Sequence, residues 1–291
     1  MEAQKQTRLK ILNSLSWLIL AAVSLSAYFL PIQATVLTLE TRYPAPVVGP
    51  SYTWYLYFIT LAGLTLFTLF QAGASPHREL IRQKARHALG WTVGASFILY
   101  SLAILSWHYE LLGLAIFLLI LTTLLLFAIN GSIREDEDLW DETLLLRAPF
   151  CLFLGWVLFL LFQTIAMRWH TLFQQDVSAF LLLAVFLFFV IYYGLTTRSP
   201  AIVLLWLAAL LLKFLQMPGS LLRWMILGCL AALVLALIAI LGKGPRYLPR
   251  HKLVSKGMDK YNFGRPSQLE ALEEELNAEL KTKPGDRIRL K

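Results

Sequence analysis

The sequence predicts an all-α protein: a polytopic transmembrane helical bundle of about eight spans, followed by a short cytoplasmic amphipathic helix at the C-terminus. Two observations predict this class. Hydrophobic residues make up 58% of the chain and charged residues only 15%, with a mean hydropathy of +0.63, whereas soluble domains carry roughly 25% charged residues. The apolar residues also gather in segments of about 20, the length at which a helix crosses roughly 30 Å of hydrocarbon with its backbone amides satisfied internally.

Eight such segments follow one another along the chain. They are 12–31, 51–71, 88–107, 110–130, 148–167, 177–195, 200–217 and 222–242. Basic residues precede the first segment, as in a signal peptide, but this segment is longer than a signal core and lacks a convincing small-residue cleavage site. We therefore expect a retained first helix and one transmembrane helical domain over residues 1–242.

The basic residues predict the orientation of this domain. With eight spans, all but four of the 26 lysine and arginine residues fall on the side of the N-terminus. The four exceptions are Arg42, Arg168, Lys213 and Arg223. Because basic residues are retained on the cytoplasmic side, we expect a multi-pass membrane protein with both termini in the cytoplasm. The net charge of +8 is then a topology signal, so the lipid bilayer, and no nucleic acid, is the expected partner of these residues.

Two further segments follow the last span. Residues 243–266 mix glycine and proline with basic residues, which is typical of a linker at the cytoplasmic membrane surface. Residues 267–291 open with a capping box of Ser267 and Glu270 and continue with leucines at three- and four-residue steps, which predicts an amphipathic helix and a tail. A helix of about 14 residues is marginal alone. We expect it to dock on its own domain, to pair with a second copy or to bind a cytoplasmic protein through residues 267–280.

Signals for catalysis and metal binding are weak. The sequence contains no Walker loop, no GxSxG, no HExxH and no dinucleotide fingerprint. The acidic run at 135–142 fits a solvated loop, and the five histidines show no ligand pair at helical spacing. Cys151 and Cys229 lack a CxxC partner, so we interpret both as small apolar fillers. We expect no enzyme activity, no catalytic residue and no metal site.

Polar and tryptophan side chains inside the spans are the remaining candidates, because lipid makes polar groups costly unless another helix satisfies them. Asn13 and Gln71 lie near the inner boundary and are expected to be interfacial. No carboxylate lies deep in a span, which argues against a proton-driven transporter. Tryptophans at helix ends, expected to anchor at the headgroups, are Trp54, Trp91, Trp107, Trp169 and Trp224. Those inside spans, for which packing between helices is favoured, are Trp17, Trp156 and Trp206.

The stretch APFCLFLGWVLFLLFQ at 148–163 is interpreted as more than an anchor. Pro149 suits the first turn of a helix, where amides lack internal partners, and Gly155 allows a neighbouring helix to approach closely. Steps of three and four residues place one set of side chains on a single face. This set is Phe153, Trp156, Leu160 and Gln163. We expect that face to point into the bundle and to form the wall of a cavity.

Three stretches, taken in order, resemble the tryptophan-rich sensory protein family, the TspO/MBR or translocator-like proteins. They are YPAPVVGPSYTWYLYFITLAGL at 43–64, SWHYELLGLAI at 106–116 and APFCLFLGW at 148–156. The last is similar to the Pro-Phe-x-x-Tyr-x-Gly-Trp start of the family's fifth helix, and the resemblance covers residues 1 to about 215. Two asparagine positions of the family read Tyr100 and Thr164 here, with Gln163 adjacent. Five-helix members have no counterpart of about three C-terminal helices, so the chain resembles a longer, divergent member.

The resemblance implies a membrane protein that binds an apolar or tetrapyrrole-like ligand, such as a porphyrin or haem, in an aromatic cavity. It implies regulation rather than transport, often as a homodimer. By position it assigns as ligand-binding residues Tyr52, Trp54, Tyr55, Tyr57, Trp107, Trp156 and Gln163. Two other hypotheses stay open. One is a structural or scaffolding membrane subunit that recruits a partner through its cytoplasmic tail, and the other is a facilitator-type transporter of a neutral solute.

Overall fold

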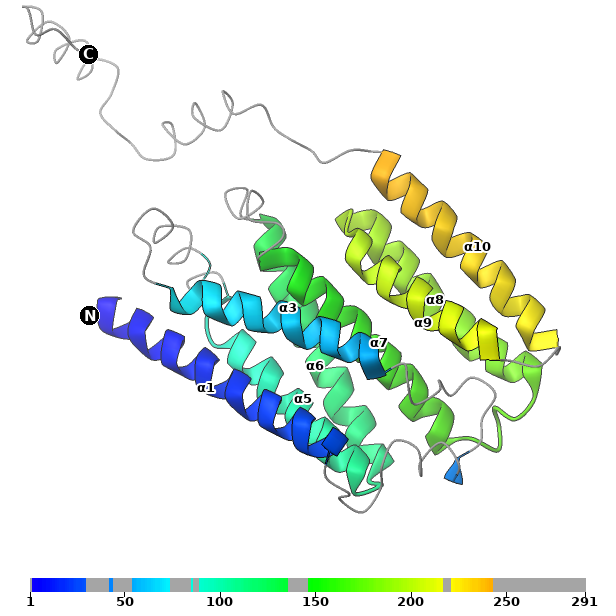
Figure 1. Cartoon of the computed structure of the whole chain (residues 1–291), viewed down its shortest axis with the longest axis horizontal. Helices are drawn as coiled ribbons and strands as arrows, with labels where there is room; N and C mark the ends of the chain where they lie inside the picture. The colour runs from blue at the N-terminus through cyan, green and yellow to red at the C-terminus, as the bar shows by residue number, and fades with distance from the viewer. Residues whose placement is uncertain are drawn as a thin grey trace, which may run out of the picture. The chain divides into compact units, whose positions relative to one another are not determined.

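The structure is a computed structural model that describes residues 2–29, 42–43, 54–73, 85, 89–135, 146–216 and 221–242. In these ranges the chain forms eight α-helices and no strand (Figure 1). The helices are α1 (Glu2–Phe29), α3 (Trp54–Ala72), α5 (Thr92–His108), α6 (Leu112–Glu135), α7 (Ala148–Arg168), α8 (Asp176–Thr197), α9 (Pro200–Gln216) and α10 (Leu221–Gly242). The prediction of an all-α bundle is confirmed. The segments expected at 243–266 and 267–291, and most of the acidic run, lie outside the described residues.

Six of the described helices contain a stretch long and apolar enough to cross a membrane. These stretches are Thr7–Ala27, Tyr55–Ala72, Leu112–Ile133, Ala148–Arg168, Asp176–Thr197 and Leu221–Gly242. The apolar helices α5 and α9 are shorter, with 17 residues each. At 1.5 Å per residue such a helix spans about 25 Å, the lower limit for crossing the hydrocarbon. The chain is therefore a multi-pass membrane protein, with two of its predicted spans at the short end of the range.

Helix α7 lies at the centre of the bundle (Figure 1). It packs against α3, α6, α8 and α9, while α5 packs between α1 and α6, and α10 packs on α8 and α9. Along α7, 89% of the residues of the apolar stretch are buried, against 22–44% in the other five long stretches. The sequence predicted one interior face for this helix. The structure corrects this to a helix buried on every side, because four neighbours surround it.

The start of α7 follows the sequence prediction. Pro149 lies in the first turn, where a missing N–H costs no helical hydrogen bond. At the other end, the N–H of Trp169 donates to the Ile165 carbonyl at 3.1 Å. The helix therefore closes its last turn just beyond Arg168, one residue past the predicted boundary.

Gly155 brings α9 close to α7, as predicted. A Cβ atom at this position would lie 3.1 Å from Ile202 Cγ1 and 3.5 Å from Ile202 Cα. The Gly155 carbonyl accepts a hydrogen bond from Trp206 Nε1 at 2.9 Å, which satisfies the indole where no water is at hand. Gly194 likewise allows α8 to lie close to α9, since a Cβ atom at Gly194 would lie 2.6 Å from Val203 Cγ2. Close packing of α9 on both α7 and α8 thus depends on these two glycines.

The tryptophans confirm one prediction and correct another. Inside the spans, Trp156 and Trp206 are buried between helices, as expected. At the helix ends the exposed tryptophans are Trp91, Trp169 and Trp224, which agrees with anchoring at headgroups. Trp107 is only 1% exposed, and its ring meets His108 edge-on at 5.7 Å. Headgroup anchoring is therefore wrong for Trp107, because the last turn of α5 is covered by other helices.

Asn13 and Gln71, which were expected near the inner boundary, are buried between helices. Both are 1% exposed, and Asn13 Nδ2 donates to Gln71 Oε1 at 3.3 Å between α1 and α3. Gly94 of α5 packs on the same group, since a Cβ there would lie 3.1 Å from Ser16 Oγ and 3.3 Å from Asn13 Oδ1. This bond pairs the Asn13 donor with the Gln71 acceptor inside the bundle, which lowers the cost of burying the two amides away from water.

Both cysteines are buried free thiols. Cys151 does more than fill space, because its Sγ donates to Asn130 Oδ1 at 3.2 Å. The Asn130 amide in turn donates to the Leu126 carbonyl at 2.9 Å. This pair links the C-terminal part of α6 to the first turn of α7, and it places a polar contact at the end of the bundle where α7 begins.

Candidate ligand-binding site

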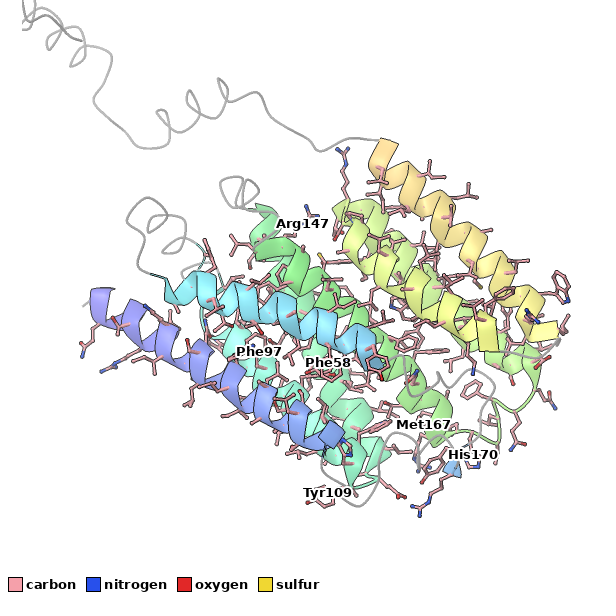
Figure 2. The ribbon with its side chains drawn as sticks, viewed as in Figure 1. Phe58, Phe97, Tyr109, Arg147, Met167 and His170 are labelled. Atoms are coloured by element: carbon pink, nitrogen blue, oxygen red, sulfur yellow. The ribbon has the colours of Figure 1, made fainter. Side chains whose placement is uncertain are left out.

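Four aromatic side chains from three helices form the aromatic cluster: Tyr57 of α3, Tyr100 of α5, and Phe153 and Trp156 of α7. Each is at most 2% exposed. The rings of Tyr57 and Trp156 stack with centroids 5.3 Å apart and an interplanar angle of 29°. Tyr100 meets Phe153 edge-on at 5.0 Å, and Phe97, labelled in Figure 2, contacts Phe153 at 6.0 Å. The cluster thus offers stacked and edge-on faces, the two arrangements that aromatic rings prefer.

Hydrogen bonds at this cluster join its helices in two pairs. Trp156 Nε1 of α7 donates to Tyr100 Oη of α5 at 2.6 Å. Tyr57 Oη and Ser24 Oγ of α1 are 2.6 Å apart, and Ser24 Oγ donates to the Leu20 carbonyl at 2.6 Å. An indole can only donate and a carbonyl can only accept. The direction of every bond is therefore fixed, with Tyr57 donating to Ser24.

The structure brings together only part of the predicted site. Tyr57 and Trp156 are in direct contact, whereas Tyr55 is 61% exposed on another face of α3 and so stands apart from the cluster. Trp54 begins α3, but its side chain, like all of Tyr52, lies outside the described residues. Their roles stay predictions.

Trp107 of α5 and Gln163 of α7 lie at the same height along the helix axes, nearer to the C-terminal ends of these two helices than the aromatic cluster. Helices α5 and α7 run in the same direction, since the ring contacts advance along both helices together. Trp107 comes seven residues after Tyr100, and Gln163 comes seven residues after Trp156. At 1.5 Å per residue this level is about 10 Å from the Tyr100–Trp156 contact. Gln163 is 3% exposed, and its Nε2 atom has no hydrogen-bond partner among the described residues.

A second aromatic group, which the sequence did not indicate, lies between α7, α8 and α9. Trp206 meets Phe159 edge-on at 5.7 Å and stacks against Phe186 at 6.3 Å, and Phe162 contacts both Trp206 and Phe186. The indole N–H of Trp206 already donates to the Gly155 carbonyl. This group packs three helices together and has no unsatisfied polar atom of its own.

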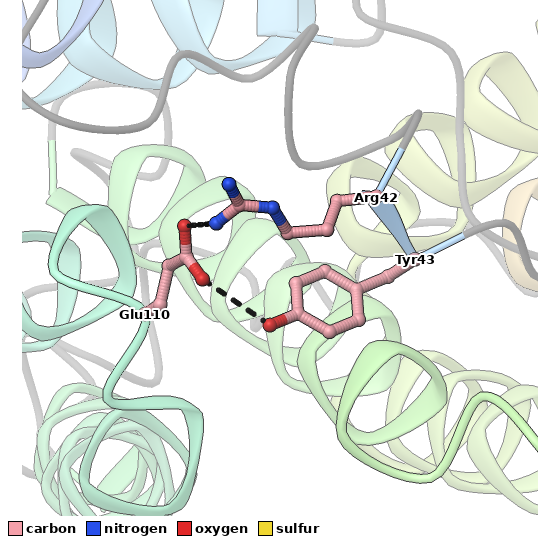
Figure 3. Close-up of polar contacts among 3 residues, drawn as sticks. All are labelled: Arg42, Tyr43 and Glu110. Carbon is pink, nitrogen blue, oxygen red and sulfur yellow. Dashed lines mark hydrogen bonds and ion pairs between the residues drawn. The ribbon is translucent and has the colours of Figure 1, made fainter.

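Three connections between helices meet at the end of the bundle where α5 and α7 finish. Glu110, in the turn between α5 and α6, pairs with Arg42, and its other carboxylate oxygen accepts from Tyr43 Oη at 3.3 Å (Figure 3). Burial, and then the negative charge of Glu110, raise the pKa of Tyr43, so its phenol stays a neutral donor. The Tyr43 ring also meets His170, after α7, edge-on at 5.6 Å. These contacts fasten residues 42–43 to the bundle.

Metal ligands do not gather in the described ranges: no group there combines three or more His, Cys, Asp or Glu side chains at a distance that could hold an ion. His108 is buried at the end of α5 and His170 packs on Tyr43. The features that distinguish the candidate site are thus aromatic faces and one buried amide.

Comparison with known proteins gives one match. A family model described as TSPO-like protein matches residues 10–241. No curated protein and no solved structure matches the chain. The match runs past residue 215, where the motifs noted in the sequence end, and it takes in α9 and α10. It therefore covers the central helix, the aromatic cluster and the helices packed around them.

Proposed function

The chain belongs to the TSPO-like protein family, and on this premise we propose that it is a membrane-embedded binding protein for a flat apolar molecule of the tetrapyrrole type. The aromatic cluster is the proposed contact surface, and binding serves regulation rather than chemistry. The proposal agrees with the intramembrane setting, since such molecules enter a bilayer readily and reach a site between helices from the lipid.

The observation that carries the proposal is the stacked pair of Tyr57 and Trp156. Their centroids are 5.3 Å apart, and they come from helices that are far apart in the sequence. Within lipid, apolar contact alone gives a ligand no preference for protein over acyl chains. Stacking on large rings does give such a preference, because ring faces attract flat π-systems with a defined geometry. A flat ligand that slides against this pair gains a contact that the acyl chains do not offer.

Quenching of tryptophan fluorescence by protoporphyrin IX tests this proposal on the purified full-length protein in nanodiscs. We expect saturable quenching at a ratio near one porphyrin per chain. Tyr57→Leu and Trp156→Leu should each weaken the apparent affinity about fivefold, because each removes one stacking face worth roughly 1 kcal/mol. The matched control is Trp224→Ala, since Trp224 is 70% exposed and far from the cluster.

Equal affinity in all of these variants would show that the porphyrin binds elsewhere on the protein. The porphyrin would merely partition into lipid if the quenching never saturates and if nanodiscs that contain only a tryptophan peptide show the same quenching. Either result would remove the proposal and leave the scaffolding hypothesis as the better account.

We further propose that both termini face the cytoplasm. The support is the distribution of basic residues: with eight spans, all but four of the 26 fall on the side of the N-terminus. Fusions at residue 1 and at residue 291 test this. Green fluorescent protein should be fluorescent at both ends and alkaline phosphatase inactive at both. Active phosphatase at either end would contradict the orientation.

A further inference from the structure

Most polar atoms of the aromatic cluster are already used within the protein. The one N–H of Trp156 is bound to Tyr100. Each hydroxyl carries a single proton to donate, and Tyr57 donates its own to Ser24, because Ser24 donates to the Leu20 carbonyl. A ligand that rests on the cluster therefore meets mainly ring faces.

Gln163 supplies a buried donor from which no described residue accepts. It follows Trp156 by seven residues, so the two side chains point from nearly the same face of α7, two turns apart. The side chain is 3% exposed and its Nε2 atom is buried without a hydrogen-bond partner among the described residues. Leaving such a group unsatisfied is costly, and more so in a medium without water. A buried amide N–H to which the described part of the chain offers no acceptor is thus a position where a ligand can contribute.

One other described N–H donor without a partner is Trp17 Nε1. Trp17 lies on α1, which packs against α3 and α5 rather than centrally as α7 does, and its ring is only partly buried. It comes seven residues before Ser24, about 10 Å along α1 on the side away from Gln163. Of these two donors, Gln163 Nε2 is the one that lies on the central helix and shares a helical face with Trp156.

We propose that the ligand carries an acceptor oxygen, a carbonyl or a carboxylate, that lies about 10 Å along the bundle from the point where its flat body contacts Trp156, and that Gln163 Nε2 donates to it. This inference rests on the proposed function, since it describes the ligand of the same site. It adds the chemical class of the polar group, its distance from the Trp156 contact, and the direction in which the ligand lies, with its polar end toward the Trp107 level.

A pair of porphyrins separates this inference from the proposed function. Protoporphyrin IX carries two carboxyl groups, which are ionised at pH 8 and act only as acceptors. Octaethylporphyrin has the same ring and only alkyl substituents. With the full-length protein in nanodiscs, Gln163→Met should weaken protoporphyrin binding about tenfold, as expected for the loss of one hydrogen bond to a charged group. It should leave octaethylporphyrin binding unchanged.

Gln71→Met is the matched control, because it makes the same change at a buried glutamine that is bonded to Asn13. This variant should melt at a lower temperature and should keep the wild-type preference between the two porphyrins. Gln163→Met should melt no lower than the wild type, since the Gln163 Nε2 atom has no partner among the described residues. A large loss of melting temperature in Gln163→Met would overturn the inference, by showing that this amide is structural.

The remaining outcomes are equally decisive. If Gln163→Met weakens both porphyrins alike, or neither, while Trp156→Leu weakens both, the inference is overturned and the proposed function stands. If neither porphyrin binds the wild-type protein saturably, the proposed function and the inference fall together.

Discussion

Gly155→Leu is expected to lower the free energy of unfolding by about 3 kcal/mol, at the upper end of the range for overpacking a core. A Cβ atom at this position would already lie 3.1 Å from Ile202 Cγ1, and 3.5 Å from the Ile202 Cα atom, and leucine adds three carbons beyond it. Helix α9 must move away from α7, which also lengthens the hydrogen bond between Trp206 Nε1 and the Gly155 carbonyl. Unfolding by sodium dodecyl sulfate in mixed micelles, followed by tryptophan emission, measures the effect.

Gly228→Leu is the control for this prediction. Gly228 also lies within an apolar helix, α10, but an added Cβ there meets nothing within 4 Å. Its replacement should change the unfolding free energy by less than about 0.5 kcal/mol, as for other exposed positions. If the two leucine variants unfold at the same detergent fraction, the close packing of α7 on α9 does not contribute to stability as the structure indicates.

Trp156→Ala is expected to have a similar or larger effect, about 3 to 5 kcal/mol. The substitution empties the space that the indole fills among Tyr57, Phe153 and Phe159, and it removes the donor to Tyr100. Trp156→Phe keeps most of the ring and loses mainly the hydrogen bond, so it should cost only about 1 kcal/mol. The same detergent unfolding experiment ranks the two variants.

The exposed Trp224 provides the comparison. Trp224→Ala should unfold close to the wild type, because 70% of the residue surface is exposed. A ranking in which Trp156→Phe is as damaging as Trp156→Ala would mean that the hydrogen bond from Trp156 to Tyr100, and not ring packing, holds the cluster together.

Much of the fold was predictable because the bilayer imposes a length. Runs of about 20 apolar residues are a strong signal, and the start of α7 was placed correctly at Ala148. The close approach of another helix to Gly155 could be predicted because glycine has no side chain. These features are local, so the residues next to each other in the sequence decide them.

What could not be predicted depends on partners that are distant in the sequence. Asn13 is separated from its bonded partner Gln71 by 58 residues, and position alone suggested that both met the headgroups. Tyr100 stood out only as a missing family asparagine, yet in the structure it accepts from Trp156, 56 residues later. No helical periodicity reports such pairs, because periodicity shows which face is polar and not which helix lies opposite.

The candidate site shows the same division. Motif order correctly brought Tyr57 and Trp156 into one group, since both lie at the positions that carry the family resemblance. The amide of Gln163 was visible in the sequence, but whether it was already bonded was not, because a glutamine in a span usually finds a partner on another helix. Its lack of one emerges only when α7 is packed among its neighbours.

The most direct measurement is the position of zinc protoporphyrin in crystals of the full-length protein, located by the anomalous scattering of the metal. The account predicts one zinc peak per chain between α3, α5 and α7, with the porphyrin plane against the rings of Tyr57 and Trp156. A peak on the lipid-facing surface of the bundle, with Tyr57 and Trp156 still stacked on each other, would contradict it.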